Sequence, residues 1–262
     1  MKQISKVFFY IDESGSPDFF GKRKRPLWFS EDFQPVLILG MLETQEPRRL
    51  QKEVKGFSEN ILSDPLFNSI YSVSQPGWYL HAKDDHPEVR IKFFEFIRQL
   101  DYVECYVIIA RKIPELFISK HNGNASEFYF DVLHNLVKQY HFQPNCHYQF
   151  YLSRRDSANT KPFTEAVQKV ISKHVGPNGD PVCTYKCDIV RSADCAELCV
   201  LDYLLWAVQR YVLKEERRYF TAMEGRIKLV YDVYGSGPGD RIYTSSNPFD
   251  LNKAGKFLKL KK

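Results

Sequence analysis

The sequence lacks any apolar stretch long enough to cross a lipid bilayer, and the aliphatic run from Val36 to Leu39 has only the length of a strand. Its first residues lack the long apolar segment and the small-residue cleavage site of a secretory signal. Sequence repeats and low-complexity tracts are also missing. These absences argue against membrane and secreted proteins, and we expect a soluble protein in the cytoplasm.

Several catalytic signatures are missing as well. The chain contains no GxGxxG, GxxxxGK[ST], HExxH or GxSxG sequence, which are the marks of dinucleotide-binding proteins, P-loop NTPases, zinc proteases and α/β-hydrolases. A phosphatase that forms an aspartyl-phosphate would need a second acid two residues after Asp12, and that position is Ser14. The chemistry therefore has to be sought in other residues.

The cysteines do not suggest a disulfide framework, because six thiols in a chain of 262 residues are typical of a reduced cytosolic protein. Four of them form two pairs spaced four apart, Cys183 with Cys187 and Cys195 with Cys199, which raises the question of a zinc site. Structural zinc sites usually place ligands two residues apart at a tight turn. Buried thiols in an apolar setting are the favoured interpretation.

What the sequence does contain is enough apolar material for a large core. Hydrophobic residues make up 44% of the chain, with 20 Phe and 16 Tyr, so global disorder is excluded. We expect one domain over residues 1–262. A net charge of +5 permits a nucleic-acid partner without requiring one.

The spacing of apolar residues predicts an alternation of strands and helices. Strands are expected near 6–12, 35–42, 102–110, 147–153 and 183–189. Helices are expected near 46–62, 87–100, 125–141, 160–175 and 195–214. Two of the helices form an insertion over residues 44–100, between the second and third strands. An antiparallel pair extended by parallel strands and closed by a final helix predicts a ribonuclease H-like mixed α/β sheet with flanking helices.

The first candidate site residues are two adjacent acids at the end of the first expected strand. The segment Val7–Ile11 is strongly hydrophobic and runs directly into Asp12 and Glu13. If the strand continues, the two side chains point in opposite directions, so that one can bind a metal while the other supports it. The alternative is a turn in which Asp12 only caps its own backbone.

Asp202 is the second candidate, because it is surrounded by apolar residues in the last expected helix. Every neighbour from Cys199 to Ala207 is apolar or aromatic, which places Asp202 on a core-facing stripe. A lone buried carboxylate costs several kcal/mol, roughly, unless it is paired or bound to a metal. The alternatives to metal binding are an ion pair with Arg210 and a hydrogen-bonded position between helix and sheet.

A third group of polar residues precedes the second helix of the insertion. His81, Asp84 and Asp85 lie just before Pro87, with Arg90 one turn into the helix. His81 can act as a general acid or as a hydrogen-bond donor to phosphate. The alternative is structural, with Asp85 as the cap of the helix.

The end of the fourth expected strand carries Ser153, where a carboxylate ligand would be expected. Arg154 and Arg155 follow it and suit contact with phosphate, as do Arg90 and Arg210. Acids that can substitute for the missing carboxylate are Asp156, Glu127 and Asp131, while Asp232 is a reserve candidate that fits a strand end or turn better.

Three segments together resemble the domain-of-unknown-function-3800 family. They are YIDESG (10–15), HAKDDHPEVR (81–90) and LDYLLWAVQR (201–210), and the resemblance extends from residue 7 to about 235. The family is bacterial and archaeal, occurs in prophages, mobile elements and defence loci, and is similar to ribonuclease H-like nucleases. The resemblance implies that Asp12, Glu13, His81, Asp85 and Asp202 are site residues. Cys199 departs from the Gln that the family usually has there.

We therefore expect a Mg²⁺- or Mn²⁺-dependent nuclease that hydrolyses phosphodiester bonds of DNA or RNA. Asp12 and Asp202 would hold metal, with Glu13 or Asp85 completing the set, while His81 and the arginines would contact phosphate. One alternative is a catalytically silent module that binds nucleic acid or protein, and another is a hydrolase of nucleotides. No membrane partner is expected, and the oligomeric state, a homodimer included, is left open.

Overall fold

A computed structural model describes residues 4–31, 33–154, 160–175, 183–235, 241–255 and 257. The strands are β1 (Ser5–Ser14), β2 (Val36–Thr44), β3 (Val103–Arg111), β4 (Cys146–Ser153), β5 (Thr184–Val190), β6 (Ile227–Val233) and β7 (Ile242–Tyr243). The α-helices are α1 (Pro47–Ser63), α2 (Pro87–Gln99), α3 (Pro114–His121), α4 (Ala125–Val137), α5 (Thr160–Ile171), α6 (Ala196–Lys214), α7 (Arg217–Met223) and α8 (Leu251–Ala254). Short 3₁₀ turns are η1 (Lys22–Lys24), η2 (Ser192–Asp194) and η3 (Glu224–Arg226).

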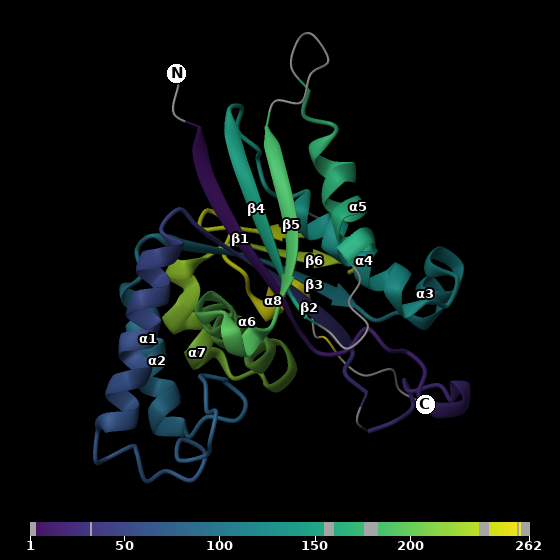
Figure 1. The fold of residues 1–262 in the computed structure, drawn as a ribbon. Helices are drawn as coiled ribbons and strands as arrows, with labels where there is room; N and C mark the ends of the chain where they lie inside the picture. The colour runs from purple at the N-terminus through teal and green to yellow at the C-terminus, as the bar shows by residue number, and fades with distance from the viewer. Residues whose placement is uncertain are drawn as a thin grey trace.

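The strands form one seven-stranded mixed sheet in the order β5-β4-β1-β2-β3-β6-β7 (Figure 1). β2 runs antiparallel to both of its neighbours, β1 and β3, while β4 lies parallel to β1 and β5 lies parallel to β4. β6 is parallel to β3, and the two-residue β7 is antiparallel to β6. This is the ribonuclease H-like arrangement predicted from the order of elements, with β6 and β7 added beyond β3.

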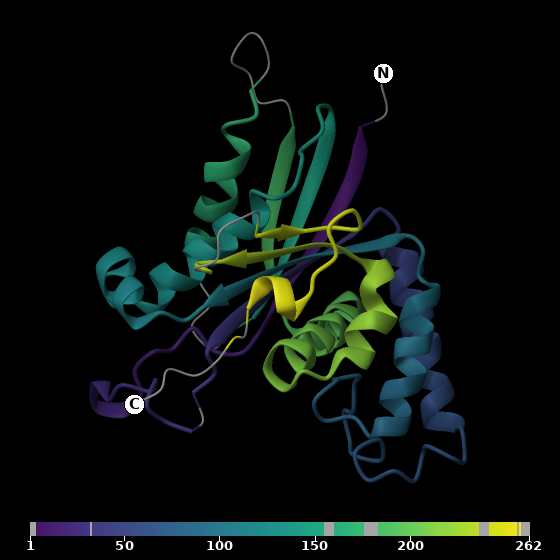
Figure 2. The same cartoon turned by 180° about the vertical axis from the view of Figure 1, so that it is seen from behind.

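Helices cover both faces of the sheet and divide the core into two layers (Figures 1 and 2). α1, α2, α6 and α7 bury their apolar faces against one side, together with Tyr10 of β1. α3, α4 and α5 cover the other side, where Phe9 and Ile11 of β1 are buried. A strand covered on both faces is hydrophobic on both faces, which explains the continuous apolar run that precedes Asp12.

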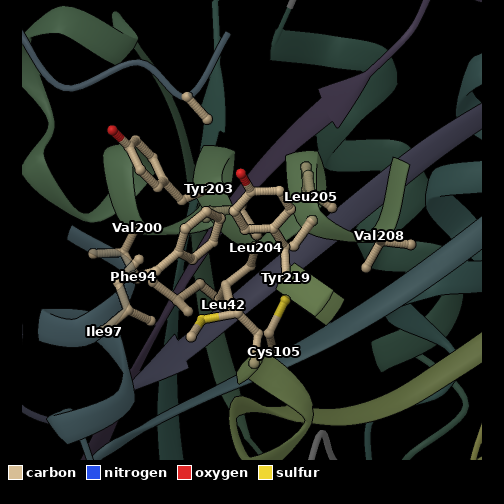
Figure 3. Packing of buried hydrophobic residues seen from close by; sticks show 14 of the residues in the cluster. Leu42, Phe94, Ile97, Cys105, Val200, Tyr203, Leu204, Leu205, Val208 and Tyr219 are labelled. Carbon is tan, nitrogen blue, oxygen red and sulfur yellow. The ribbon is translucent and has the colours of Figure 1, made fainter. Parts of the chain in front are cut away.

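The first layer is built around α6. Figure 3 shows its buried side chains among those of α2, β2, β3 and α7, and the labelled residues are Leu42, Phe94, Ile97, Cys105, Val200, Tyr203, Leu204, Leu205, Val208 and Tyr219. Nearly all of α6 from Leu198 to Val208 is buried, and this explains why apolar residues surround Asp202 in the sequence.

All five predicted strands and all five predicted helices are confirmed, with ends that differ by a few residues. The helical insertion is also found, since α1 and α2 lie between β2 and β3. Five helices and strands of the described chain were not predicted, namely α3, α7, α8, β6 and β7. No helix within the described ranges combines the length and the apolar character that a bilayer crossing would need.

Candidate active site

β1 delivers its two acids to opposite faces of the sheet. Glu13 follows the parity of Phe9 and Ile11, and its Oε2 accepts a hydrogen bond of 3.1 Å from the Tyr129 hydroxyl of α4. Asp12 follows the parity of Tyr10 and faces the layer that contains α6. The predicted divergence of the two side chains is therefore found, and Glu13 lies across the sheet from Asp12.

Asp12 is held by neutral donors beside other acids. Its Oδ1 accepts the Glu13 backbone N–H at 2.9 Å. Burial raises the pKa of Asp12 to about 7, and the charges of Glu13 and Asp202 add to the rise, while the nearby Ser153 hydroxyl opposes it. Ser153 thus occupies the strand end predicted for a carboxylate, and its hydroxyl forms a hydrogen bond of 2.7 Å with the Ser192 hydroxyl.

Asp202 projects from α6 toward the loop that precedes α2. Its Oδ2 accepts the Ala82 N–H at 2.7 Å, and its Oδ1 lies 3.8 Å from His81 Nε2. Burial raises the pKa of Asp202 as well, while the nearby His81 opposes the rise. The expected alternative of an ion pair with Arg210 is not found, because Arg210 donates to Glu216 through both Nε, at 2.7 Å, and Nη2.

Gly40 of β2 has no side chain, and this lets α6 lie close to β1 and β2. Gly40 is the register partner of Asp12, and a Cβ atom there would lie 2.6 Å from Leu205 Cδ2 and 2.8 Å from Leu201 Cδ1. Both leucines are buried, so the space beside Gly40 is already filled. The close approach brings the α6 backbone, and with it Asp202, toward the Asp12 end of the sheet.

Asp85 holds the loop from Trp78 to His86 against α6. It is 3% exposed, and its carboxylate accepts hydrogen bonds from Trp78 Nε1 at 2.9 Å, the His81 N–H at 2.9 Å and the Tyr203 hydroxyl at 2.5 Å. Burial raises its pKa. The helix cap suggested for Asp85 is formed by His86 instead, whose Nδ1 accepts the Glu88 N–H.

Arg90 supports the same loop from within α2. Its Nε donates to the Ala82 carbonyl at 2.7 Å and its Nη2 to the Asp85 carbonyl at 2.6 Å, while the guanidinium lies 4.5 Å from the Trp206 ring centre. Arg90 and Asp85 therefore position His81 next to Asp202. His81 Nδ1 lies 2.8 Å from Asp84 Oδ2 but without hydrogen-bond geometry, while Nε2, on the other side of the ring, lies 3.8 Å from Asp202 Oδ1.

The other predicted residues lie apart from this group. Arg154 is exposed beyond β4, while Arg155 and Asp156 fall outside the described residues. Glu127 and Asp131 lie on α4, on the far face of the sheet, and accept hydrogen bonds from Asn122 and Lys120. Asp232 is not at a turn but inside β6, where it is 2% exposed and Arg111 donates to it through two nitrogens at 3.0 and 2.8 Å.

Cys199 lies among the acids. The pKa of its thiol is raised to about 12, first by burial and then by the charges of Asp202, Asp85, Glu197 and Asp12. All six cysteines are free, and none of the described ones belongs to a cluster that could hold zinc. Of the four thiols in the two predicted pairs, Cys183 and Cys199 are buried, whereas Cys187 and Cys195 are only partly buried.

Glu197 was not predicted as a site residue. It is 5% exposed in the first turn of α6, and its Oε1 accepts the Tyr10 hydroxyl at 2.9 Å. The signal was available, because Glu197 precedes the same apolar run as Asp202 and the cost of burying a carboxylate applies equally to both.

Asp12 and Asp202 are the residues that suit a divalent cation. Among the described residues no group of three or more His, Cys, Asp or Glu side chains is arranged to hold a metal. Mg²⁺ commonly binds through only one or two carboxylates and takes its other ligands from water and substrate phosphates. Burial raises the pKa of both carboxylates, and the charge of Asp202 adds to the rise at Asp12, so two hard oxygen donors lie near each other and fit such a site.

Two cavities flank the sheet. One of about 480 Å³ lies on the Asp12 side, beside the ends of β4 and β5, and is lined by residues that include Arg154, Arg191 and Glu197. The larger one, about 760 Å³, lies between α4 and α5 on the opposite side. The larger cavity is separated by the sheet from the Asp12–Asp202 pair.

Comparison with known proteins gives matches only among solved structures. No protein-family model matches this chain, and no curated protein matches it either. The ribonuclease H2 from Pyrococcus horikoshii OT3 is 14% identical, with a TM-score of 0.44 over 81% of this chain and 77% of that chain. The RNase HII of the PCNA:RNase HII complex from Archaeoglobus fulgidus is 11% identical, with a TM-score of 0.45 over 82% of this chain and 78% of that chain.

Proposed function

We propose that this protein is a divalent-metal-dependent nuclease that hydrolyses phosphodiester bonds of DNA or RNA. The observation that carries the proposal is the juxtaposition of Asp12 and Asp202, two partly buried carboxylates from β1 and α6, beside His81. Membership of the domain-of-unknown-function-3800 family, with its mobile-element and defence contexts, is part of the same proposal. Mg²⁺ or Mn²⁺ is the proposed cofactor.

Asp12 and Asp202 would hold the cation from two separate elements. A bound Mg²⁺ or Mn²⁺ would supply Lewis-acid chemistry, which polarises a phosphate oxygen and lowers the pKa of water. The Glu13 N–H keeps the Asp12 carboxylate oriented by hydrogen bonding, and the Ala82 N–H does the same for Asp202. These donors leave carboxylate lone pairs for a ligand, since each oxygen accepts up to two.

His81 would take part in proton transfer to the leaving oxygen or donate a hydrogen bond to phosphate. Its Nε2 lies 3.8 Å from Asp202 Oδ1 and its Nδ1 lies 2.8 Å from Asp84 Oδ2, so the ring lies between two acids. A positioned His can donate a proton to a leaving oxygen or a hydrogen bond to a phosphate. Asp85 and Arg90 hold the loop that presents His81, and we assign them a positioning role instead of direct contact with substrate.

Cleavage of end-labelled DNA and RNA in Mg²⁺, in Mn²⁺ and in EDTA tests the proposal. We expect cleavage by wild type with either metal, none in EDTA, and a loss of about a hundredfold or more in Asp12→Asn and Asp202→Asn. Asp101→Asn, in the exposed turn before β3, is the matched control and should retain full activity. Equal cleavage by all four proteins would contradict the proposal.

Metal binding supplies a second readout that does not depend on activity. Mn²⁺ should raise the melting temperature of wild type, because a ligand that binds only the folded state stabilises it. The rise should be absent in Asp12→Asn and Asp202→Asn and present in Asp101→Asn.

A module that binds nucleic acid without cutting it is the second candidate function. It is favoured by one observation, that Ser153 ends β4 where a further carboxylate ligand was expected. Tight binding of labelled oligonucleotides together with an absence of cleavage in both metals would support this candidate over the nuclease.

A further inference from the structure

The cavity of about 480 Å³ lies next to the proposed catalytic pair. It is lined by Tyr10, two residues before Asp12 on the same face of β1, and by Tyr151 at the adjacent end of β4. Arg154 and Arg191 line it where β4 and β5 end, and Glu197 lines it from the first turn of α6. Its size falls within the range of about 300–1,000 Å³ that is usual for small-ligand pockets.

Two tyrosines form an aromatic wall of this cavity. The rings of Tyr10 and Tyr151 are stacked, with centroids 5.1 Å apart and planes inclined by 21°. Tyr10 is buried, whereas Tyr151 is only partly buried and contributes open aromatic surface. Aromatic side chains at such a surface are the platforms on which unpaired nucleic-acid bases stack.

Glu197 supplies a carboxylate at the same cavity. Its Oε1 accepts the Tyr10 hydroxyl at 2.9 Å and its Oε2 accepts the Cys195 thiol at 3.3 Å, so both of these donors are neutral. Because each carboxylate oxygen has two acceptor positions, Glu197 can accept one further hydrogen bond on each oxygen. The cavity therefore presents two adjacent acceptors and calls for a ligand with two adjacent donors.

Among the four bases, guanine has the matching edge. Its Watson–Crick edge places the N1–H and N2–H donors side by side, whereas adenine and cytosine each pair one donor group with a ring-nitrogen acceptor. Uracil and thymine present a single N–H between two carbonyl oxygens, which a carboxylate would repel. Arg154 at the same cavity is suited to a phosphate beside the base, whereas Arg191 donates to Asp194, another lining residue, at 2.6 and 3.0 Å.

We propose that this cavity is a guanine-recognition pocket for single-stranded nucleic acid, and that Glu197 is its specificity-determining residue. The proposal rests on the proposed nuclease function and deepens it, because a base held there would place a neighbouring phosphate on the Asp12 side of the sheet. Stacking on Tyr151 would supply affinity for any base, and Glu197 would supply the choice among bases.

Binding of short labelled oligonucleotides in EDTA tests the pocket without cleavage. The DNA arm uses oligothymidylates with one central guanine, adenine, cytosine or hypoxanthine, and the RNA arm uses the equivalent oligouridylates. We expect wild type to bind the guanine-containing strand about tenfold or more tightly than the others. Hypoxanthine, which lacks the N2 amino group, should fall between guanine and adenine.

Glu197→Gln gives the sharpest comparison. The amide offers one acceptor and one donor, so the preference should move from guanine to adenine, while the amide oxygen can still accept from Tyr10. Tyr151→Leu should weaken binding to all four bases alike, by about tenfold. Glu127→Gln, on α4 across the sheet, is the matched control and should keep the guanine preference.

The outcomes separate this proposal from the nuclease proposal. The guanine-pocket proposal is contradicted if wild type binds all bases with equal affinity. It is also contradicted if the Glu197→Gln variant has an unchanged melting temperature and still prefers guanine. If Asp12→Asn abolishes cleavage while base preference is absent, the nuclease stands and the pocket fails. If wild type prefers guanine in EDTA but never cleaves with metal, the pocket stands and the nuclease fails. A preference found in only one arm supports the pocket and assigns its strand as DNA or RNA.

Discussion

Asp12 and Asp232 are acids near the ends of two strands, and their surroundings differ: Asp232 is buried, whereas Asp12 is only partly buried. Asp232 in β6 receives two guanidinium nitrogens of Arg111, so its negative charge is matched by a fixed cation. Asp12 receives only neutral donors and faces the charge of Asp202. An acid that is paired with a cation stabilises the fold, whereas an acid that lies beside another acid is available to bind a ligand. This contrast carries the assignment of the site more than burial does.

The largest expected effect comes from removing Arg111, the cation that pairs with Asp232. Arg111→Met should lower the free energy of unfolding by about 3–5 kcal/mol, because Asp232 would remain buried without its partner. Urea denaturation measures the change. Arg111→Met combined with Asp232→Leu should recover much of the loss. If Arg111→Met alone were as stable as wild type, Asp232 would not depend on a paired cation, and it would not differ from Asp12 in this respect.

Neutralisation of Asp12, which receives only neutral hydrogen-bond donors, should stabilise the protein. The pKa of Asp12 is about 7 in the folded protein and near 3.8 in the unfolded chain, so between these values the folded state binds the extra proton. The free energy of unfolding therefore falls as pH rises through this window. Asp12→Asn should remove that fall and be about 1–3 kcal/mol more stable than wild type at pH 8 in EDTA, with little difference near pH 4. A destabilised Asp12→Asn at pH 8 would contradict the contrast.

Crowding the glycine beside Asp12 should test how closely the acids must approach. Gly40→Ala forces Leu201 and Leu205 to move, which should cost about 1–3 kcal/mol and shift α6. Under the proposed function it should also reduce cleavage, while Gly56→Ala, where the added Cβ meets nothing, is the control. If Gly40→Ala kept both its stability and its cleavage activity, α6 would not need to lie this close to Gly40.

The smallest effect should come from a matched pair that is exposed. Arg210 and Glu216 form an ion pair near the end of α6, with side chains 38% and 22% exposed. Glu216→Gln should change the free energy of unfolding by less than about 1 kcal/mol. A loss comparable to that of Arg111→Met would mean that exposure does not separate the two pairs.

Much of the fold follows from local patterns, because buried strands and amphipathic helices differ in the period of their apolar residues. β6 was not predicted as a strand, although Asp232 was expected at a strand end or a turn and is in fact the next-to-last residue of β6. Its partner Arg111 lies 121 residues away, and no local pattern announces such a pair. α3 and α7 are short, and eight or seven residues hold too few turns for a clear period.

The site was partly predictable for a related reason. Asp202 stands out because a carboxylate inside an apolar helix needs an explanation, and the same logic, applied one turn earlier, identifies Glu197. The roles of Asp85 and Arg90 were not predictable, because they depend on which backbone groups the folded loop brings within reach. Tertiary hydrogen bonds of this kind have no signature in spacing along the chain.

The position of Asp202 on α6 also has a consequence for the time at which the site forms during synthesis. β1 is made first and its neighbour β2 soon after, but β4 and α6, which also flank Asp12, come much later in the chain, and α6 follows β5. A nascent chain that has not yet released α6 from the ribosome holds Asp12 without its partner. Chains stalled or truncated before that point would carry half of the acid pair, so under the proposed function cutting activity would belong only to nearly finished molecules.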